Sequence, residues 1–219
     1  MSAPLMMDQQ QAYPSLITAL CERNAYTRVH CDRVCILATA LGNALRLRPR
    51  DLEALRIASQ LHDIGKIGIR DEVLLKPGRL TPEEWEEVKT HSIRGERIVN
   101  ETFLTNRTDV AAIVRHHHES RDGSGYPDGL SGDEIPQSCR ILSIVDKYDA
   151  MTSVRVYRNP MSHGEAMAVL HEESISKIDP MIFSAFAIVM SRNDLRTMRP
   201  QPSHRRAAAR IAPVQYSAD

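Results

Sequence analysis

Apolar residues recur three and four positions apart along most of this 219-residue chain, a spacing typical of amphipathic helices. The clearest run extends from Tyr26 to Leu45 and contains Val29, Val34, Leu37, Ala38, Leu41 and Leu45. No run alternates between apolar and polar residues as an isolated strand would. Aromatic residues make up only 5% of the chain, which favours helices packed on helices over a β-sandwich. The sequence therefore predicts an all-α fold, a helical bundle.

Local signals place the ends of several helices. A helix that begins at Pro49 leads into the sequence LHDIGKIG and is expected to end at Gly65 and Gly68. After a predicted loop over residues 70–80, Thr81 and Glu84 form a capping box that opens one helix to about Asn100. Further helices are predicted over residues 109–117, 138–151, 162–173 and 179–190. The polar, glycine-rich segment 119–136 is predicted to be a long loop, and its length suggests a function.

One domain is predicted, over residues 13–191. Residues 1–12 are expected to be a flexible lead-in, and residues 192–219, rich in arginine and proline, a disordered tail. Lysine plus arginine equals aspartate plus glutamate, 28 each, which argues against a nucleic acid polymer or an anionic membrane as partner. Because no apolar run reaches 18 residues and no signal pattern begins the chain, we expect a soluble, cytoplasmic protein.

The adjacent pair His62 and Asp63, at the end of a predicted helix, is the sharpest chemical signal. Imidazole nitrogen and carboxylate oxygen are suitable ligands for divalent iron and manganese. Two such ligands at a helix end can address two neighbouring ions, with the carboxylate as a bridge between them. Lys66 lies one turn further on, where it could neutralise phosphate charge or protonate a leaving oxygen.

Other candidate ligands lie on, or at the ends of, different predicted helices: His30, His91, His117, His118 and Asp146. A helix bundle can project such side chains from several helices into one interior metal site. We therefore predict a two-metal centre at which a bridging hydroxide attacks a phosphodiester.

Four segments together resemble the HD-GYP group of the HD phosphohydrolase superfamily: LHDIGKIGI, HHHE, DGSGYPDGLSGDEIP and RILSIVDKYDAMTSVRVYR. The resemblance covers about residues 14 to 190. It implies a helical bundle of the HD-domain type with a long glycine-rich GYP loop. It also implies two or three iron or manganese ions and hydrolysis of the bacterial second messenger cyclic di-GMP.

The resemblance assigns roles to particular residues. The metal ligands of the family fall on His30, His62, Asp63, His91, His117, His118 and Asp146, with Asp63 as the bridging carboxylate. Lys66 matches a lysine that contacts the scissile phosphate. Arg155 and Arg158 match basic positions that hold ligand phosphates, and Tyr126 matches a loop residue beside the substrate pocket.

Three positions qualify this assignment. Members with a third metal carry a carboxylate where this chain has Tyr26, so two ions are favoured here. His116 is expected to pack or hydrogen-bond nearby instead of binding metal. Asp149 has two possible roles: it could support a metal ligand, or it could be only a polar residue in helix packing.

The predicted activity is hydrolysis of cyclic di-GMP to linear pGpG, to GMP, or to both, and a two-metal site favours pGpG. One alternative is a cyclic di-GMP sensor or partner-binding regulatory module with little turnover. Another is an HD hydrolase that acts on a different nucleotide, such as a dNTP or ppGpp. The resemblance also implies a contact between the GYP loop and diguanylate cyclases that carry a GGDEF motif, and a homodimer stays open.

Overall fold

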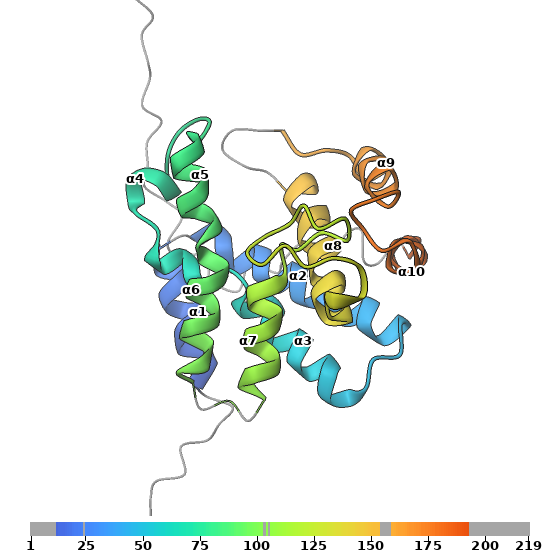
Figure 1. The fold of residues 1–219 in the computed structure, drawn as a ribbon, viewed down its shortest axis with the longest axis horizontal. Coiled ribbons are helices and arrows are strands. Elements are labelled where there is room, and N and C mark those ends of the chain that lie inside the picture. The colour runs from blue at the N-terminus through green and yellow to red at the C-terminus, as the bar shows by residue number, and fades with distance from the viewer. Residues whose placement is uncertain (1–11, 24, 103, 105, 154–158, 193–219) are drawn as a thin grey trace, which may run out of the picture.

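The computed structural model describes residues 12–23, 25–102, 104, 106–153 and 159–192, and these ranges form a bundle of helices (Figure 1). The α-helices are α1 Ala12–Arg23, α2 Ala25–Ala44, α3 Pro49–Leu61, α4 Asp71–Leu74, α5 Pro82–Lys89, α6 His91–Asn100, α7 Arg107–His116, α8 Gln137–Thr152, α9 His163–Glu173 and α10 Pro180–Met190. Two short 3-10 helices are η1 Ile64–Gly68 and η2 Gly132–Glu134. No strand occurs in the described ranges. The predicted all-α fold is confirmed.

Side-chain caps set the start of three helices, as the sequence predicts. Thr81 accepts a hydrogen bond from the backbone N–H of Glu84, whose own carboxylate accepts from the backbone N–H of Thr81. Ser162 and Glu165 form the same reciprocal pair at the start of α9. Asp179 accepts hydrogen bonds from two backbone N–H groups in the first turn of α10. These caps satisfy N–H groups that have no partner within the helix.

The structure corrects the predicted helices at three places. The single helix expected from residue 82 to 100 is two helices, α5 and α6, which are interrupted at Thr90. The Thr90 hydroxyl donates to the carbonyl of Glu87, a local bond that competes with the regular helical pattern. The predicted loop over residues 70–80 contains the short helix α4, and the sequence did not predict α1.

The core lies between the long helices. Helix α2 packs against α3 and α8, while α7 packs against α3 and α6. Leu55, Val114, Ile144 and Phe186, on four different helices, are fully buried where these helices meet. In Figure 1, α1, α6 and α7 lie on one side of the molecule and α9 and α10 on the other. Among the described helices, none combines the length and apolar character that a membrane crossing needs.

Gly65 allows η1 to lie directly against the start of α6. A β-carbon at this position would lie 1.9 Å from the carbonyl oxygen of His91 and 2.6 Å from the backbone nitrogen of Gly95. Only glycine fits such a close approach of two backbones. This contact brings the segment that carries Asp63 next to His91.

Candidate metal centre

Three predicted ligands from three different helices form a first cluster. His30 comes from α2, His62 follows the last residue of α3, and Asp146 comes from α8. Nε2 of His30 lies 3.2 Å from both Nε2 of His62 and Oδ1 of Asp146, and Nε2 of His62 lies 3.8 Å from the same carboxylate oxygen. Two nitrogens and one oxygen therefore converge on one point in the interior, as a metal ligand set does.

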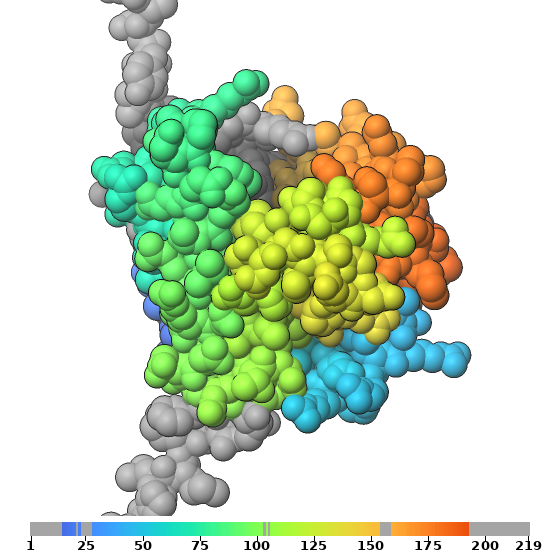
Figure 2. Space-filling model, in the orientation of Figure 1, coloured from blue at the N-terminus to red at the C-terminus, as the bar shows by residue number. Residues whose placement is uncertain are grey.

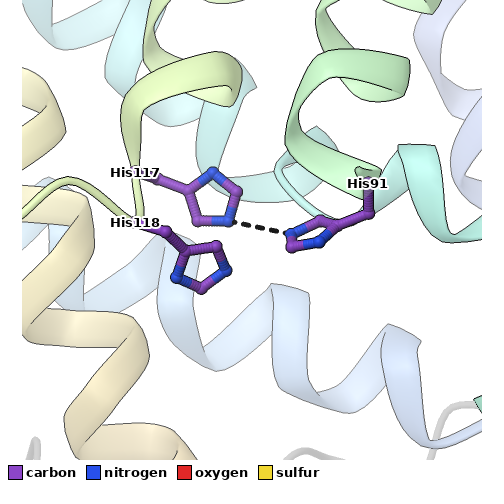
Figure 3. A group of neighbouring side chains, drawn as sticks. All are labelled: His91, His117 and His118. Carbon is purple, nitrogen blue, oxygen red and sulfur yellow. Dashed lines mark hydrogen bonds between the residues drawn. The ribbon is translucent and has the colours of Figure 1, made fainter. Parts of the chain in front are cut away.

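Three histidines form a second cluster, which Figure 3 shows. His91 is the first residue of α6, and His117 and His118 follow directly on the last residue of α7. Nε2 of His91 lies 3.4 Å from Nε2 of His117, and the ring centroids of His91 and His118 are 5.0 Å apart. One nitrogen of each ring lies within 4.8 Å of the others.

Asp63 lies between the two clusters and turns one carboxylate oxygen towards each. Its Oδ2 is 3.7 Å from Nε2 of His62 and 3.9 Å from Nε2 of His30. Its Oδ1 is 3.8 Å from Nε2 of His91. A carboxylate in this position can share its two oxygens between two neighbouring ions.

The outer nitrogen of each of four imidazoles is held by an oxygen atom. Nδ1 of His62, His91 and His117 donates to the carbonyl of the residue three positions earlier, at 2.9, 2.7 and 2.7 Å respectively. Nδ1 of His30 lies 2.7 Å from the Asp149 carboxylate. When such a ring is neutral, the proton on Nδ1 leaves Nε2 with a free lone pair that faces the interior of the site, and this is the form in which histidine binds metal in proteins.

Asp149 supports His30 from behind and is itself held by Arg33. The guanidinium of Arg33 donates to both carboxylate oxygens, one of them at 2.8 Å, and also to the hydroxyl of Ser153. Of the two roles that the sequence left open for Asp149, these contacts favour support of a candidate ligand.

The electrostatics of the second cluster favour neutral imidazoles. Burial, together with the positive charge of Lys66, lowers the pKa of His91 to about 4. Burial and the neighbouring His91 lower the pKa of His118 to about 3, and burial also holds the pKa of His117 well below its ordinary value. Because neutral imidazole is the form that binds metal, this cluster is ready for an ion at neutral pH.

The first cluster is more strongly charged. Burial by itself would lower the pKa of His30, but hydrogen bonds to Asp146 and Asp149 outweigh it and raise that pKa to about 10. Burial works against ionisation of Asp63 and Asp146 as well. The charge of Lys66 nevertheless holds the pKa of Asp63 well below its ordinary value, and the bond to His30 does the same for Asp146. Both carboxylates are ionised at neutral pH, as metal binding requires.

Lys66 lies in η1 and reaches back to Asp63. Its ammonium group donates to Oδ2 of Asp63 at 2.7 Å and is half-buried. The predicted proximity of this lysine to the ligand pair therefore appears in the structure, through a turn of 3-10 helix.

Tyr126, in the glycine-rich loop, lies over the second cluster. Its ring stacks on His118 with centroids 4.8 Å apart, and its backbone N–H donates to the carbonyl of the same histidine. The centroid of His91 is 6.5 Å away. The tyrosine predicted beside the substrate pocket is thus in contact with a candidate metal ligand.

Glu119 anchors this loop, and the sequence analysis assigned it no role. Its carboxylate is buried and accepts hydrogen bonds from the backbone N–H groups of Asp128 and Leu130, at 2.8 and 3.1 Å. A signal was available, because an acidic residue directly after three histidines and before a glycine-rich loop is well placed to bind backbone N–H groups. Gly125 lets the loop lie directly against this residue, since a β-carbon at Gly125 would lie 2.5 Å from the Cα of Glu119.

His116 does not join either cluster. Its Nε2 lies 2.8 Å from Oδ2 of Asp128, which also accepts a hydrogen bond from Arg115. The expectation that this histidine hydrogen-bonds nearby agrees with these contacts.

Three predicted positions cannot be placed. Arg155 and Arg158 lie outside the described residues. Tyr26 belongs to α2, but its side chain is outside the described part of the structure, so the argument for two ions instead of three stays a prediction.

Comparison with known proteins identifies the family of this chain. The family model described as "HD domain" matches residues 10–182, most of the chain. A cyclic di-GMP phosphodiesterase of Thermotoga maritima is 40% identical over 164 residues, 75% of this chain and 45% of the relative. A 3′3′-cGAMP-specific phosphodiesterase of Vibrio cholerae is 37% identical over 163 residues, 74% of this chain and 35% of the relative.

A solved structure shows the same fold. The HD domain of the Listeria monocytogenes phosphodiesterase PgpH, in complex with cyclic di-AMP, matches with a TM-score of 0.63 at 16% identity, and the match covers 85% of this chain and 99% of that one. The chain belongs to the HD domain family, and the predicted resemblance to its HD-GYP group is confirmed. The chain spans less than half the length of these two curated relatives.

Proposed function

We propose that this chain is a cyclic di-GMP phosphodiesterase with a two-metal centre. The observation that carries the proposal is the meeting of two buried ligand clusters at one carboxylate, Asp63. The named activities of the relatives support the reaction class. A module that only bound a nucleotide would have no need of seven converging ligand side chains.

In this proposal, His30, His62 and Asp146 would hold one ion, His91, His117 and His118 would hold the other, and Asp63 could contribute to both. A donor set of imidazoles and carboxylates suits iron or manganese. Bound there, two divalent ions would lower the pKa of the attacking water and neutralise charge on the phosphate oxygens.

The side chains around the clusters orient the substrate. Lys66 donates to Asp63 with its ammonium group, which can contact the scissile phosphate and stabilise charge on the leaving 3′ oxygen. The Tyr126 ring covers His118 and is placed to contact a substrate bound at the centre. Burial, with the nearby charges of Asp146 and Asp63, raises the pKa of the Tyr126 phenol, so it stays a neutral hydrogen-bond donor. Arg155 and Arg158 are proposed to bind the phosphates.

The choice of substrate rests on the named activities of the relatives. The names of the relatives include both cyclic di-GMP and 3′3′-cGAMP, so a cyclic dinucleotide is the shared class. We favour cyclic di-GMP, with linear pGpG as the main product and GMP as a further one. Contact with GGDEF-containing diguanylate cyclases, a cytoplasmic location and a homodimer stay predictions.

The test is product analysis. Protein loaded anaerobically with manganese or iron is incubated with cyclic di-GMP, 3′3′-cGAMP, cyclic di-AMP, pGpG and dNTPs, and the products are separated by chromatography. We expect linear dinucleotide from cyclic di-GMP at the highest rate. The variant Lys66→Met tests the role of the ammonium group separately from metal binding, because it removes that group and leaves all seven proposed ligands in place.

Two results would overturn the proposal. If metal-loaded protein binds cyclic di-GMP but returns it intact after prolonged incubation, the chain is a sensor. If dNTPs are hydrolysed and cyclic dinucleotides are not, the chain is a metal-dependent phosphohydrolase of another nucleotide.

A further inference from the structure

Trp85 is a large aromatic side chain that the fold leaves exposed. It lies on α5, and 47% of its surface is accessible to solvent. It is also the single tryptophan of the 219-residue chain. An exposed indole contributes little to the core, so a role in ligand binding depends on how close it lies to the metal centre.

Trp85 is separated from the candidate metal ligands by one aromatic ring. The Tyr126 ring stacks on His118 with centroids 4.8 Å apart, and the Trp85 ring lies 6.4 Å from the same tyrosine ring. The planes of Trp85 and Tyr126 meet at 81°, so the two rings make an edge contact and do not stack. The aromatic row therefore extends from the metal centre out to the surface and ends in a partly exposed indole.

Side chains of both charges lie beside this row, because α5 carries glutamates on either side of Trp85 and two lysines lie nearby. Lys89 lies one turn after Trp85 on the same helix, and its ammonium group is 5.9 Å from the Tyr126 centroid. Glu86 pairs with Lys89 and offsets part of its charge. Lys66, at the centre itself, is a second half-buried cation. In Figure 2, the green surface that contains α5 and the yellow-green surface that contains the glycine-rich loop meet on one face.

We propose that Trp85 stacks on one purine base of a cyclic dinucleotide whose scissile phosphate lies at the metal centre. In a nucleotide, one ribose separates the phosphate from its base, and in this structure one tyrosine ring separates His118 from Trp85. Aromatic side chains bind bases through their faces, with little preference between bases. Trp85 thus supplies affinity for any purine dinucleotide, and other residues choose between guanine and adenine. The inference rests on the proposed function for the site that it extends.

The first test uses Trp85 as its own reporter. Since no other tryptophan is present, the indole emission of the metal-loaded protein, excited selectively over its six tyrosines, comes from this position. Stacking on guanine quenches indole emission. We expect cyclic di-GMP, mixed rapidly and measured before turnover, to quench most of the signal. Inorganic phosphate, which has no base, should leave the signal unchanged. An emission that stays constant at saturating cyclic di-GMP would overturn the proposal.

The second test compares variants that keep or remove an aromatic face. Trp85→Phe keeps a face, whereas Trp85→Leu keeps an apolar side chain without one. We expect Trp85→Leu to raise KM for cyclic di-GMP about tenfold with kcat changed less than about twofold, and Trp85→Phe to raise KM much less. Ile188→Ala, at an exposed apolar residue on α10, is the control and should change neither constant.

A purely structural role predicts a different pattern. If Trp85 only supports the Tyr126 loop, Trp85→Leu lowers the melting temperature and kcat and leaves KM unchanged, and that result would contradict base stacking. If the protein binds cyclic di-GMP without hydrolysing it, the proposed enzyme fails. The dissociation constant then replaces KM in the same comparison of variants. Failure of the proposed enzyme activity is thus distinguishable from failure of base stacking by Trp85.

Discussion

At the scale of single residues, the candidate centre depends on contacts behind its ligands as much as on the ligands. His62, His91 and His117 each donate Nδ1–H to a backbone carbonyl within their own turn. His30 is different, because its partner is the Asp149 side chain, which Arg33 holds in turn. A single substitution can therefore remove the support of His30 without touching a ligand.

Asp149→Ala should weaken metal binding by about 10- to 100-fold, the usual effect of losing such a supporting carboxylate. The reason is that His30 loses the acceptor that orients its ring and fixes its proton on Nδ1. Manganese titration by calorimetry measures the change. Asp51→Ala, which removes an exposed carboxylate paired with Arg48, is the matched control and should bind metal normally. Equal affinity in the two variants would show that the support is not needed.

At the scale of elements, two close backbone contacts position the site. The first is the approach of η1 to α6 at Gly65, which places Asp63 beside His91. The second is the glycine-rich loop, which Glu119 ties down by two backbone N–H groups so that Tyr126 covers His118. Neither contact uses the metal-facing atoms of a proposed ligand, since the first is made by the His91 backbone and the second by Glu119.

Gly65→Ala should destabilise the protein by about 2 to 4 kcal/mol and reduce metal binding, because the new methyl group would overlap the His91 carbonyl. Denaturant unfolding measures the first effect and metal analysis the second. Gly164→Ala is the matched control, since a β-carbon there meets nothing within 4 Å in a helix. That control should be neutral or more stable by about 0.5 to 1 kcal/mol. Similar losses in both variants would refute the close-contact explanation.

Glu119→Gln should release the loop. Each carboxylate oxygen of Glu119 accepts one backbone N–H, whereas an amide has a single oxygen and would turn its own N–H donors towards the second backbone N–H. We expect a loss of about 1 to 3 kcal/mol in stability, with a raised KM for cyclic di-GMP as Tyr126 moves. Glu172→Gln, at an exposed position on α9, gives the baseline. An unchanged KM in the Glu119 variant would mean that loop position does not affect substrate binding.

At the scale of the whole molecule, much of the fold was predictable because apolar spacing and capping residues act locally. Thr81, Ser162 and Asp179 start their helices as expected. The break at Thr90 did not follow from apolar spacing, because it combines the local bond of the Thr90 hydroxyl to Glu87 with the tertiary contact of Gly65 with the His91 backbone. The side chains that form the two clusters were predicted, but their division between the clusters was not, because it depends on how five helices pack.

The opposing pKa shifts predict how the stability of the metal-free protein depends on pH. The pKa values of His91 and His118 are lowered to about 4 and about 3 on folding, so the unfolded chain binds more protons below about pH 6.5 and stability falls as the pH drops. The pKa of His30 is raised to about 10, so its stabilisation is complete below about pH 6.5 and is lost as the pH rises towards 10. Stability should therefore be highest near pH 6.5.

Urea unfolding of the EDTA-treated protein between about pH 4 and about pH 10 measures this profile. In His30→Gln the decline on the alkaline side should largely disappear. A wild-type profile that keeps rising through the alkaline range would be incompatible with a raised pKa of His30.

The central claim, two ions joined by Asp63 at one hydrolytic site, is tested most directly by counting metal in active protein. Anaerobically loaded wild type and Asp63→Ala are analysed for manganese per chain and for hydrolysis of cyclic di-GMP in the same preparation. We predict two ions per wild-type chain, and fewer than two in the variant together with loss of turnover. A variant that retains two ions and full activity would contradict the account.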